Sequence, residues 1–266
     1  MCDVFNMQMI LSPPPLSPFV TVLMYHQVGH FNNPKLHRPV YCDVGRFRRQ
    51  MAWLHWCGYS VISLDDAYAC LFQGKKIPPR AVVLTFDDGC ENFREHAWPI
   101  LKKYHFPATV FLVAGMLGKS TSWMDDVPEE APLMTAETVR ALHKDGVHFG
   151  AHSMNHVRLA LVSPEKAREE IFSSKAGLED LLGEAVPDFC YPYGSYNAQV
   201  ADMVAEAGYR SGLTCIRGAA NYAKNPFEIP RKAISYGDTL PGYLWKVHKK
   251  NVPKANANGA NAVLTC

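Results

Sequence analysis

The stretch AVVLTFDDGCEN (residues 81–92) places two acidic residues, Asp87 and Asp88, directly behind an apolar run. A short apolar run that ends in a turn signal is typical of a strand buried on both faces. The stretch therefore predicts a buried strand over 81–86. It also raises the question of why two like charges lie side by side where that strand leaves the core.

Similar strand-like runs alternate with helical patterns along most of the chain. Apolar residues recur at helical spacing over 43–59, and Ser163 and Gly183 mark the start and end of another predicted helix. Strands that alternate with helices of this length predict βα units and a parallel sheet. Seven or eight strand candidates fit a closed α/β barrel better than a short open sheet. The clearest candidates are TVLMYH (21–26), SVIS (60–63), AVVLTF (81–86), ATVFLVA (108–114), VHFGAH (147–152), DFCYPYG (188–194) and YRSGLTC (209–215).

The composition is that of one globular domain. The chain has 266 residues, a usual length for a single α/β barrel, and 48% of them are apolar. We expect a disordered Pro-rich lead over 1–18, the barrel over 19–250 and a disordered tail over 251–266. The formal net charge is +2 and no basic block is present, which argues against nucleic acid and anionic membranes as partners.

The sequence also bears on the compartment. No stretch approaches the ~18 uninterrupted apolar residues of a transmembrane helix. The first residues lack a basic segment, and Pro13, Pro14 and Pro15 interrupt their apolar stretch, so they do not form a convincing signal peptide. The eight cysteines include no CxxC pair, and reduced thiols fit a chain of this size. We expect a cytoplasmic protein.

Three polar clusters follow strand-like runs and are expected to meet on one face of the barrel. They are His26, the pair Asp87 and Asp88, and the segment HSMNH with His152 and His156. Two histidines four residues apart share one side of a helical turn or of a tight loop. Two imidazoles and one carboxylate form a three-ligand site of the kind that catalytic zinc uses. The second aspartate is then free to act as a general base, and His26 as the acid.

Each cluster also has a structural interpretation. An Asp-Asp-Gly sequence alone is usually a turn or a helix N-cap. A single HxxxH is more often a solvated helix face, and His26 fits a hydrogen-bonded core histidine. The functional interpretation depends on the coincidence of all three clusters at the ends of three strand candidates.

Together these residues resemble the polysaccharide deacetylase family, carbohydrate esterase family 4, with its NodB-homology domain. TFDDG matches the first motif of that family and HSMNH its H-S/T-x-x-H motif, while YPYG (191–194) lies where the family has R-x-P-Y. The resemblance covers about residues 20–245. It implies a distorted (β/α)7 barrel that hydrolyses N-acetyl groups of amino sugars with a divalent metal, zinc first, with cobalt or nickel as alternatives.

The resemblance also assigns roles to individual residues. It implies that Asp87 is the general base and that Asp88, His152 and His156 are the metal ligands. It further implies that Tyr193, which follows Pro192, provides a backbone N–H to an oxyanion, an interaction typically worth about 3 kcal/mol of barrier. A turn shaped by Pro192 and Tyr193 is the structural alternative.

The chain departs from the family pattern at two points. Cys190 stands where R-x-P-Y has its arginine, and Arg231 in EIPRKAI is our candidate replacement, although a surface arginine in a surface ion pair is an equal alternative. Most of the family places its general acid in a late Leu-x-His segment, but the late histidine here, His248, lies between lysines and is expected to be solvated. The early segment YHQV is similar to the poly-N-acetylglucosamine deacetylase branch, so His26 is our candidate acid.

The leading interpretation is a metal-dependent N-deacetylase with a carbohydrate substrate. Hydrolysis of another amide, formyl or cyclic, is an alternative on the same fold, and a non-catalytic glycan-binding relative is another. A non-haem iron oxygenase shares the ligand set but leaves the paired aspartate unexplained. The aromatic residues expected either to stack on sugars or to lie in the core are Trp123, Tyr191, Tyr193 and Tyr196.

Overall fold

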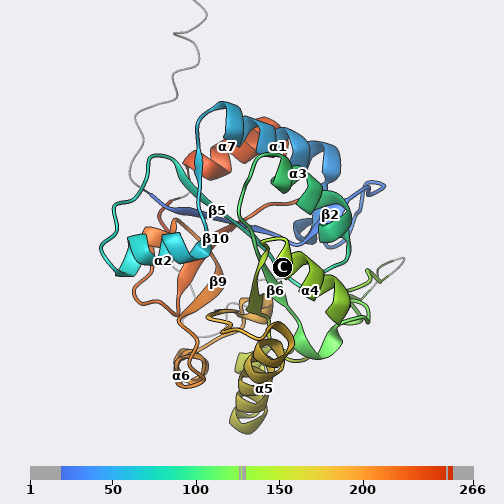
Figure 1. The fold of residues 1–266 in the computed structure, drawn as a ribbon, viewed down its shortest axis with the longest axis vertical. Helices are drawn as coiled ribbons and strands as arrows, with labels where there is room; N and C mark the ends of the chain where they lie inside the picture. The colour runs from blue at the N-terminus through green and yellow to red at the C-terminus, as the bar shows by residue number, and fades with distance from the viewer. Residues whose placement is uncertain (1–18, 126, 128–129, 250, 254–266) are drawn as a thin grey trace, which may run out of the picture.

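Seven parallel strands close into a barrel. Figure 1 shows the helices around it. The computed structural model describes residues 19–125, 127, 130–249 and 251–253. The strands, in their order around the barrel, are β1 (Thr21–Tyr25), β10 (Ile229–Ala233), β9 (Ser211–Arg217), β8 (Asp188–Cys190), β7 (His148–Ala151), β6 (Thr109–Leu112) and β5 (Ala81–Phe86). The predicted barrel is confirmed, and its seven strands match the count that the family resemblance implied.

The barrel closes through β1, which pairs with β10 on one side and with β5 on the other. It is distorted at two places. The pairing of β7 with β8 is short, with Ala151 opposite Phe189. The register of β9 against β10 shifts between Ile229 and Arg231. Three short strands lie beside the barrel: β4 (Ser60–Val61) pairs with the start of β5, while β2 (Gln27–Gly29) and β3 (Tyr41–Asp43) pair with each other.

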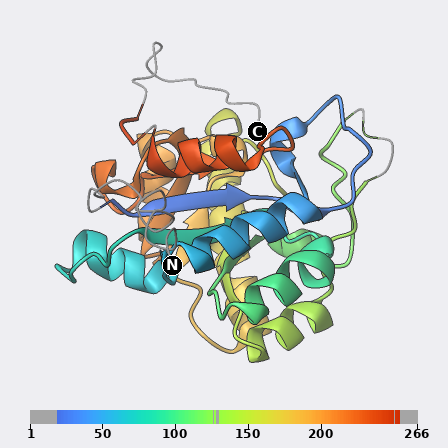
Figure 2. The same cartoon turned by 90° about the horizontal axis from the view of Figure 1, so that it is seen from above.

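Seven α-helices surround the strands in the described part of the chain. Those with the clearest sequence signals have the predicted ends: Ser163 accepts the N-cap hydrogen bond of α5, and Gly183 ends that helix with a φ of 72°. α1 and α7 contact each other and lie on either side of β1 in Figure 2. The helices are α1 (Val44–Trp56), α2 (Leu64–Phe72), α3 (Trp98–Lys103), α4 (Ala136–Lys144), α5 (Pro164–Leu182), α6 (Ala198–Glu206) and α7 (Leu240–His248).

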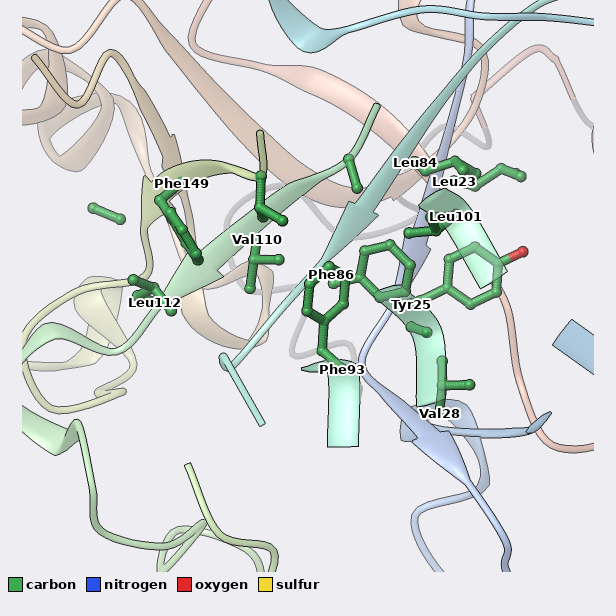
Figure 3. Packing of buried hydrophobic residues seen from close by; sticks show 14 of the residues in the cluster. Leu23, Tyr25, Val28, Leu84, Phe86, Phe93, Leu101, Val110, Leu112 and Phe149 are labelled. Carbon is green, nitrogen blue, oxygen red and sulfur yellow. The ribbon is translucent and has the colours of Figure 1, made fainter. Parts of the chain in front are cut away.

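The barrel strands send alternate side chains to two separate apolar layers, as the two-residue period of a strand requires. Tyr25 and Phe86 face the helices and stack on each other, with Phe93 against Phe86 (Figure 3). Val22 and Val83 belong to the second layer, inside the barrel. Because both faces of each strand are buried, the strand sequences consist almost entirely of apolar residues.

The expectations for the two chain ends lie largely outside the described residues. This holds for the predicted lead over 1–18 and for 254–266 of the predicted tail. Of the described tail residues, Asn251 packs against the barrel, since its backbone carbonyl accepts from Ala219 and its side chain accepts from Lys232. In the part of the chain that the structure describes, no helix is long and apolar enough to cross a membrane.

Gly150 in β7 makes room for Phe111 inside the barrel, and this close approach generates a stability prediction. A Cβ at Gly150 would lie 2.4 Å from the Phe111 ring and 2.9 Å from the backbone oxygen of Asp188. Gly150→Ala is therefore expected to lower the free energy of unfolding by about 1–3 kcal/mol, as measured by urea denaturation.

The matched control is Gly177→Ala in α5, where an added Cβ meets no atom within 4 Å. Because alanine is favoured over glycine inside a helix, this variant should gain about 0.5–1 kcal/mol. Equal stability of the two variants would contradict the tight packing inside the barrel.

Candidate active site

The carboxyl ends of the barrel strands bring the predicted polar residues to one face. Tyr25 of β1 lies opposite Phe86 of β5 in the strand register. The residues that follow these strands, His26 and Asp87, therefore lie side by side. The Asp87 N–H donates to the Tyr25 carbonyl at 2.9 Å. Both continue the inward phase of their strands, so their side chains point into the mouth of the barrel. This is the face where barrel enzymes carry their chemistry.

Asp87 forms a buried, bidentate ion pair with Arg231. Nη1 and Nη2 of Arg231 donate to Oδ1 and Oδ2 of Asp87 at 2.7 and 2.8 Å. The exposed fraction is 0% for Arg231 and 2% for Asp87. The alternative of a surface arginine is therefore wrong, and the structure brings the guanidinium to Asp87 as the sequence predicted.

The same guanidinium also contacts three other barrel strands. Nε donates to the carbonyl of Thr214 in β9 at 3.0 Å, and Nη1 donates to the hydroxyl of Thr85 in β5 at 3.2 Å. Nη2 lies 3.0 Å from the sulfur of Cys190, which in turn lies 3.4 Å from Asp87 Oδ2. Cys190, at the position of the family's arginine, thus lies beside the cation that β10 provides.

The environment fixes the charge states of this pair. Burial by itself opposes ionisation of Asp87, but the adjacent Arg231 guanidinium outweighs it and holds the pKa of that carboxyl well below its usual range. Burial raises the pKa of the Cys190 thiol well above its usual value, so the sulfur stays protonated. Asp87 is consequently an ionised carboxylate in a buried site.

Asp88 turns away from this pair and faces two histidines. Its Oδ1 lies 3.5 Å from Nε2 of His152 and 3.3 Å from Nε2 of His156. All three side chains are buried. Burial opposes ionisation of Asp88, but the nearby His156 outweighs it and lowers the pKa of the carboxyl. Burial and the neighbouring His156 lower the pKa of His152 to about 4, so its ring is neutral at pH 7.

These three residues fit a divalent metal. Their ligand atoms lie within 4.8 Å of one another. Asp88 Oδ1 is buried and has no hydrogen-bond partner in the described part of the protein, which leaves an acceptor open for a cation. His152 Nδ1 lies 2.8 Å from the Cys190 carbonyl, which sets this nitrogen as the donor and leaves Nε2 as the ligand.

A second group, Asp87 with His152 and Cys190, also brings three ligand atoms together. It fits a metal less well because both carboxylate oxygens of Asp87 accept from the Arg231 guanidinium. A metal ion there would lie against that fixed positive charge. We therefore assign the fit to the group formed by Asp88, His152 and His156.

The two histidines lie on a tight loop, not on a helical turn. Ser153 and His156 have left-handed backbones, with φ values of 60° and 56°, and the Ser153 hydroxyl accepts from the His156 N–H. Glu170 of α5 supports the loop because its carboxylate accepts from the N–H groups of Met154 and Asn155 at 3.0 and 2.7 Å.

The sequence analysis missed Glu170, although a signal exists. It lies on the buried face of α5 between Ala167 and Ile171, at a spacing that marks the apolar side of the helix. A carboxylate at such a position requires hydrogen-bond partners, and the loop supplies them.

The two candidate acids lie at opposite ends of the barrel. His26 follows β1, is 6% exposed, and its Nδ1 has no hydrogen-bond partner among the described residues. His248 ends α7 and lies with Thr21 and Ala81, the first residues of β1 and β5. Its Nε2 is 2.6 Å from the hydroxyl of Tyr59, so the expectation of a solvated His248 is wrong.

Flat side chains line a cavity of about 270 Å³ over these residues. Trp123 stacks on His156 with ring centroids 4.2 Å apart, and Tyr193 meets His156 edge to face at 4.5 Å. Tyr193 has a left-handed backbone with a φ of 57° and lies in the turn that Pro192 begins. Burial raises the pKa of the Tyr193 hydroxyl to about 12, so it stays protonated.

The aromatic residues named in the sequence analysis divide between the cavity and the core. Tyr191 is fully buried, donates to the Phe227 carbonyl and stacks on Tyr196 at 4.8 Å. Tyr191 also lines the cavity, together with Trp123 and Tyr193. Two further lining residues, His37 and Arg158, were not predicted, because they lie on loops that no periodic pattern locates.

The buried ion pair generates a prediction about stability and pH. Arg231→Met leaves Asp87 buried without its partner, so the free energy of unfolding at pH 7 should fall by about 3–5 kcal/mol in urea titrations. The pair stabilises the native protein fully above the unfolded pKa of about 3.9, and this contribution is lost as the pH falls toward the folded value.

In the variant, burial without the guanidinium raises the Asp87 pKa above the unfolded value, so the deficit should shrink from pH 7 to pH 4. Arg168→Met, which removes an exposed pair with Glu206, is the control and should cost less than about 1 kcal/mol. A deficit independent of pH would contradict the charge assignment of Asp87.

The chain is similar to several known proteins. The family model described as polysaccharide deacetylase matches residues 74–212. YxkH of Bacillus subtilis is 27% identical over 216 residues, which are 81% of this chain and 71% of that protein. The poly-β-1,6-N-acetyl-D-glucosamine N-deacetylase of Staphylococcus aureus is 27% identical over 199 residues; the match covers 71% of this chain but only 66% of the length of that enzyme.

Solved structures are similar over most of the chain. The Streptococcus pyogenes deacetylase PplD, in complex with acetate, is 26% identical with a TM-score of 0.75, and the match covers 87% of this chain and 99% of that one. IcaB from Ammonifex degensii is 21% identical with a TM-score of 0.74 over 88% and 99% of the two chains, which supports the fold. From the motifs, the barrel and the family match, this chain belongs to the polysaccharide deacetylase family, whose members are hydrolases that act on amide bonds.

Proposed function

We propose that the protein is a metal-dependent N-deacetylase that hydrolyses the acetamido group of an amino sugar in a polysaccharide or glycan precursor. The observation that carries the proposal is the division of the acidic pair. Asp87 is held ionised by Arg231, while Asp88 faces His152 and His156. One cavity therefore offers a base beside a three-ligand group. The named activity of the Staphylococcus aureus relative, a poly-β-1,6-N-acetyl-D-glucosamine N-deacetylase, supports the substrate class.

Asp88, His152 and His156 would hold the metal, and the donor set of two imidazoles and one carboxylate favours zinc. The bound ion supplies a Lewis acid and a water molecule of lowered pKa. Asp87 takes a proton from the attacking water. Oδ1 of Asp87 still has a lone pair beside its bond to Arg231, whereas Oδ2 accepts from both Arg231 and Cys190. The guanidinium holds Asp87 in its ionised form, which is the form that accepts a proton.

The other residues act on the leaving group and on the developing negative charge. An amide nitrogen leaves poorly unless it is protonated, and His26 lies beside Asp87 at the mouth of the barrel with a buried, unpartnered ring nitrogen. Tyr193, in the turn that Pro192 begins, lines the same cavity, and its backbone N–H is our candidate donor to an oxyanion. Trp123 and Tyr193 offer rings on which a sugar can stack.

The first test is acetate release from N-acetylglucosamine oligomers by metal-stripped protein, with and without Zn²⁺ or Co²⁺. Wild-type protein should release acetate only with metal. Asp87→Asn should bind zinc as the wild type does but lose turnover by about 10²–10⁴-fold, because the base is removed and the ligands stay. Asp88→Asn should lose zinc and activity together.

The outcomes separate the alternatives. Stoichiometric zinc binding without acetate release would reject the acetyl group as the substrate and direct the search to formyl and cyclic amides. Protein that binds no metal and releases no acetate would overturn the proposal in favour of a glycan-binding relative. Normal turnover by Asp87→Asn would reject this residue as the base.

The acid role is tested with the two candidate histidines as a matched pair. His26→Asn should lower kcat by about 10²-fold or more while KM changes little, because proton donation to the leaving nitrogen is lost. His248→Asn, at the other end of the barrel, should leave both parameters near wild type. An unchanged kcat in His26→Asn would move the acid role to another group.

A further inference from the structure

Arg158 ends a continuous row of flat side chains along the cavity wall. Its guanidinium carbon lies 3.9 Å from the centroid of the Tyr193 ring. Tyr193 meets His156 at 4.5 Å, and His156 stacks on Trp123 at 4.2 Å. One aromatic ring therefore separates the arginine from a proposed metal ligand. All four side chains line the same cavity.

The charge of Arg158 has no acidic partner within the described residues, where no carboxylate oxygen lies within 4.0 Å of its guanidinium. Its Nη1 is buried and, among those same residues, makes no hydrogen bond. Three carboxylates line the same cavity: Asp87 pairs with Arg231, Asp88 faces the two histidines, and Asp125 forms no ion pair with Arg158 among the described residues. A guanidinium is always protonated, and a buried donor without an acceptor is costly.

We propose that Arg158 determines substrate specificity by binding a negatively charged substituent, a carboxylate or a phosphate, on the amino sugar. This inference rests on the proposed function and names its substrate more closely. The stack on Tyr193 holds the plane of the guanidinium, which favours two parallel hydrogen bonds to the oxygens of such a group. The row of rings places that group one ring away from the metal-ligand histidine, on the deacetylated sugar or on its neighbour.

A structural role for Arg158 predicts a different result. If the arginine only supports Tyr193, its loss should weaken binding and turnover of every sugar to the same degree. If the arginine binds the charged group of the substrate, its loss should weaken the binding of acidic sugars and leave the affinity for neutral sugars unchanged. The comparison of acidic with neutral sugars therefore separates the two roles.

Binding is measured by calorimetry on zinc-loaded protein in the Asp87→Asn background, where turnover does not interfere. The three probes are N-acetylglucosamine, its 3-O-carboxyethyl ether and its 6-phosphate. At least one acidic probe should bind about tenfold or more tightly than the neutral sugar, and Arg158→Gln should abolish that preference while the neutral affinity stays within about threefold. The preference should also decrease with added salt.

The matched control is Arg168→Gln. Arg168 also lies over an aromatic ring, Phe172, at 4.4 Å, but it is exposed and pairs with Glu206 of α6. It should leave all three affinities unchanged. Arg158→Lys keeps the charge without the planar fork and should retain only part of the preference.

Each outcome decides the proposal. Tighter binding of the ether identifies a carboxylate as the ligand, and tighter binding of the ester identifies a phosphate. Equal affinity of wild-type protein for all three probes, or a uniform loss in Arg158→Gln, would overturn it. Charge preference without acetate release from any sugar would reject the proposed deacetylase activity and leave the anion site standing.

Discussion

The buried ion pair between Arg231 and Asp87 is the interaction on which the arrangement of the site depends. One guanidinium donates to Asp87 after β5 and to the Thr214 carbonyl of β9, and it lies against the Cys190 sulfur of β8. Since Arg231 itself belongs to β10, a single side chain links four strands. A charge pair buried this deeply is stable only when its geometry is good and its remaining donors are satisfied, and Arg231 meets both conditions.

The interior below this pair is shaped to receive it. Gly150 leaves space for the Phe111 ring, and the Arg231 guanidinium lies over that ring, 5.9 Å from its centroid. Gly150, the Phe111 ring and the Arg231 guanidinium thus follow one another inside the barrel, and the missing side chain of Gly150 leaves the space that the ring occupies. A larger residue at Gly150 would push the ring toward the guanidinium, so a packing change deep in the barrel is coupled to the position of Asp87.

The sequence was informative where function follows directly from strand ends. The barrel was predictable because its strands are buried on both faces, and the positions of His26, Asp87 and His152 followed because each residue comes directly after such a strand. The sequence was less informative where the chain leaves regular structure. The row formed by Arg158 and Tyr193 lies on irregular loops. No periodic pattern specifies those loop conformations. The contact of Arg231 with Asp87 joins residues 144 positions apart, and the sequence offered it only beside an equal alternative, a surface ion pair.

The backbone explains how two adjacent acidic residues can lie at the end of β5, because it separates their two like charges. Asp87 continues the inward phase of β5 to the guanidinium. Asp88 then takes a left-handed conformation, with a φ of 74°, and Gly89 follows with 76°. Aspartate tolerates that conformation better than most side chains. At Gly89, an added Cβ would lie 2.6 Å from Leu112, so glycine is required there. The sharp turn points the two carboxylates in different directions, Asp87 to the Arg231 guanidinium and Asp88 to His152 and His156, and it thereby separates the two like charges.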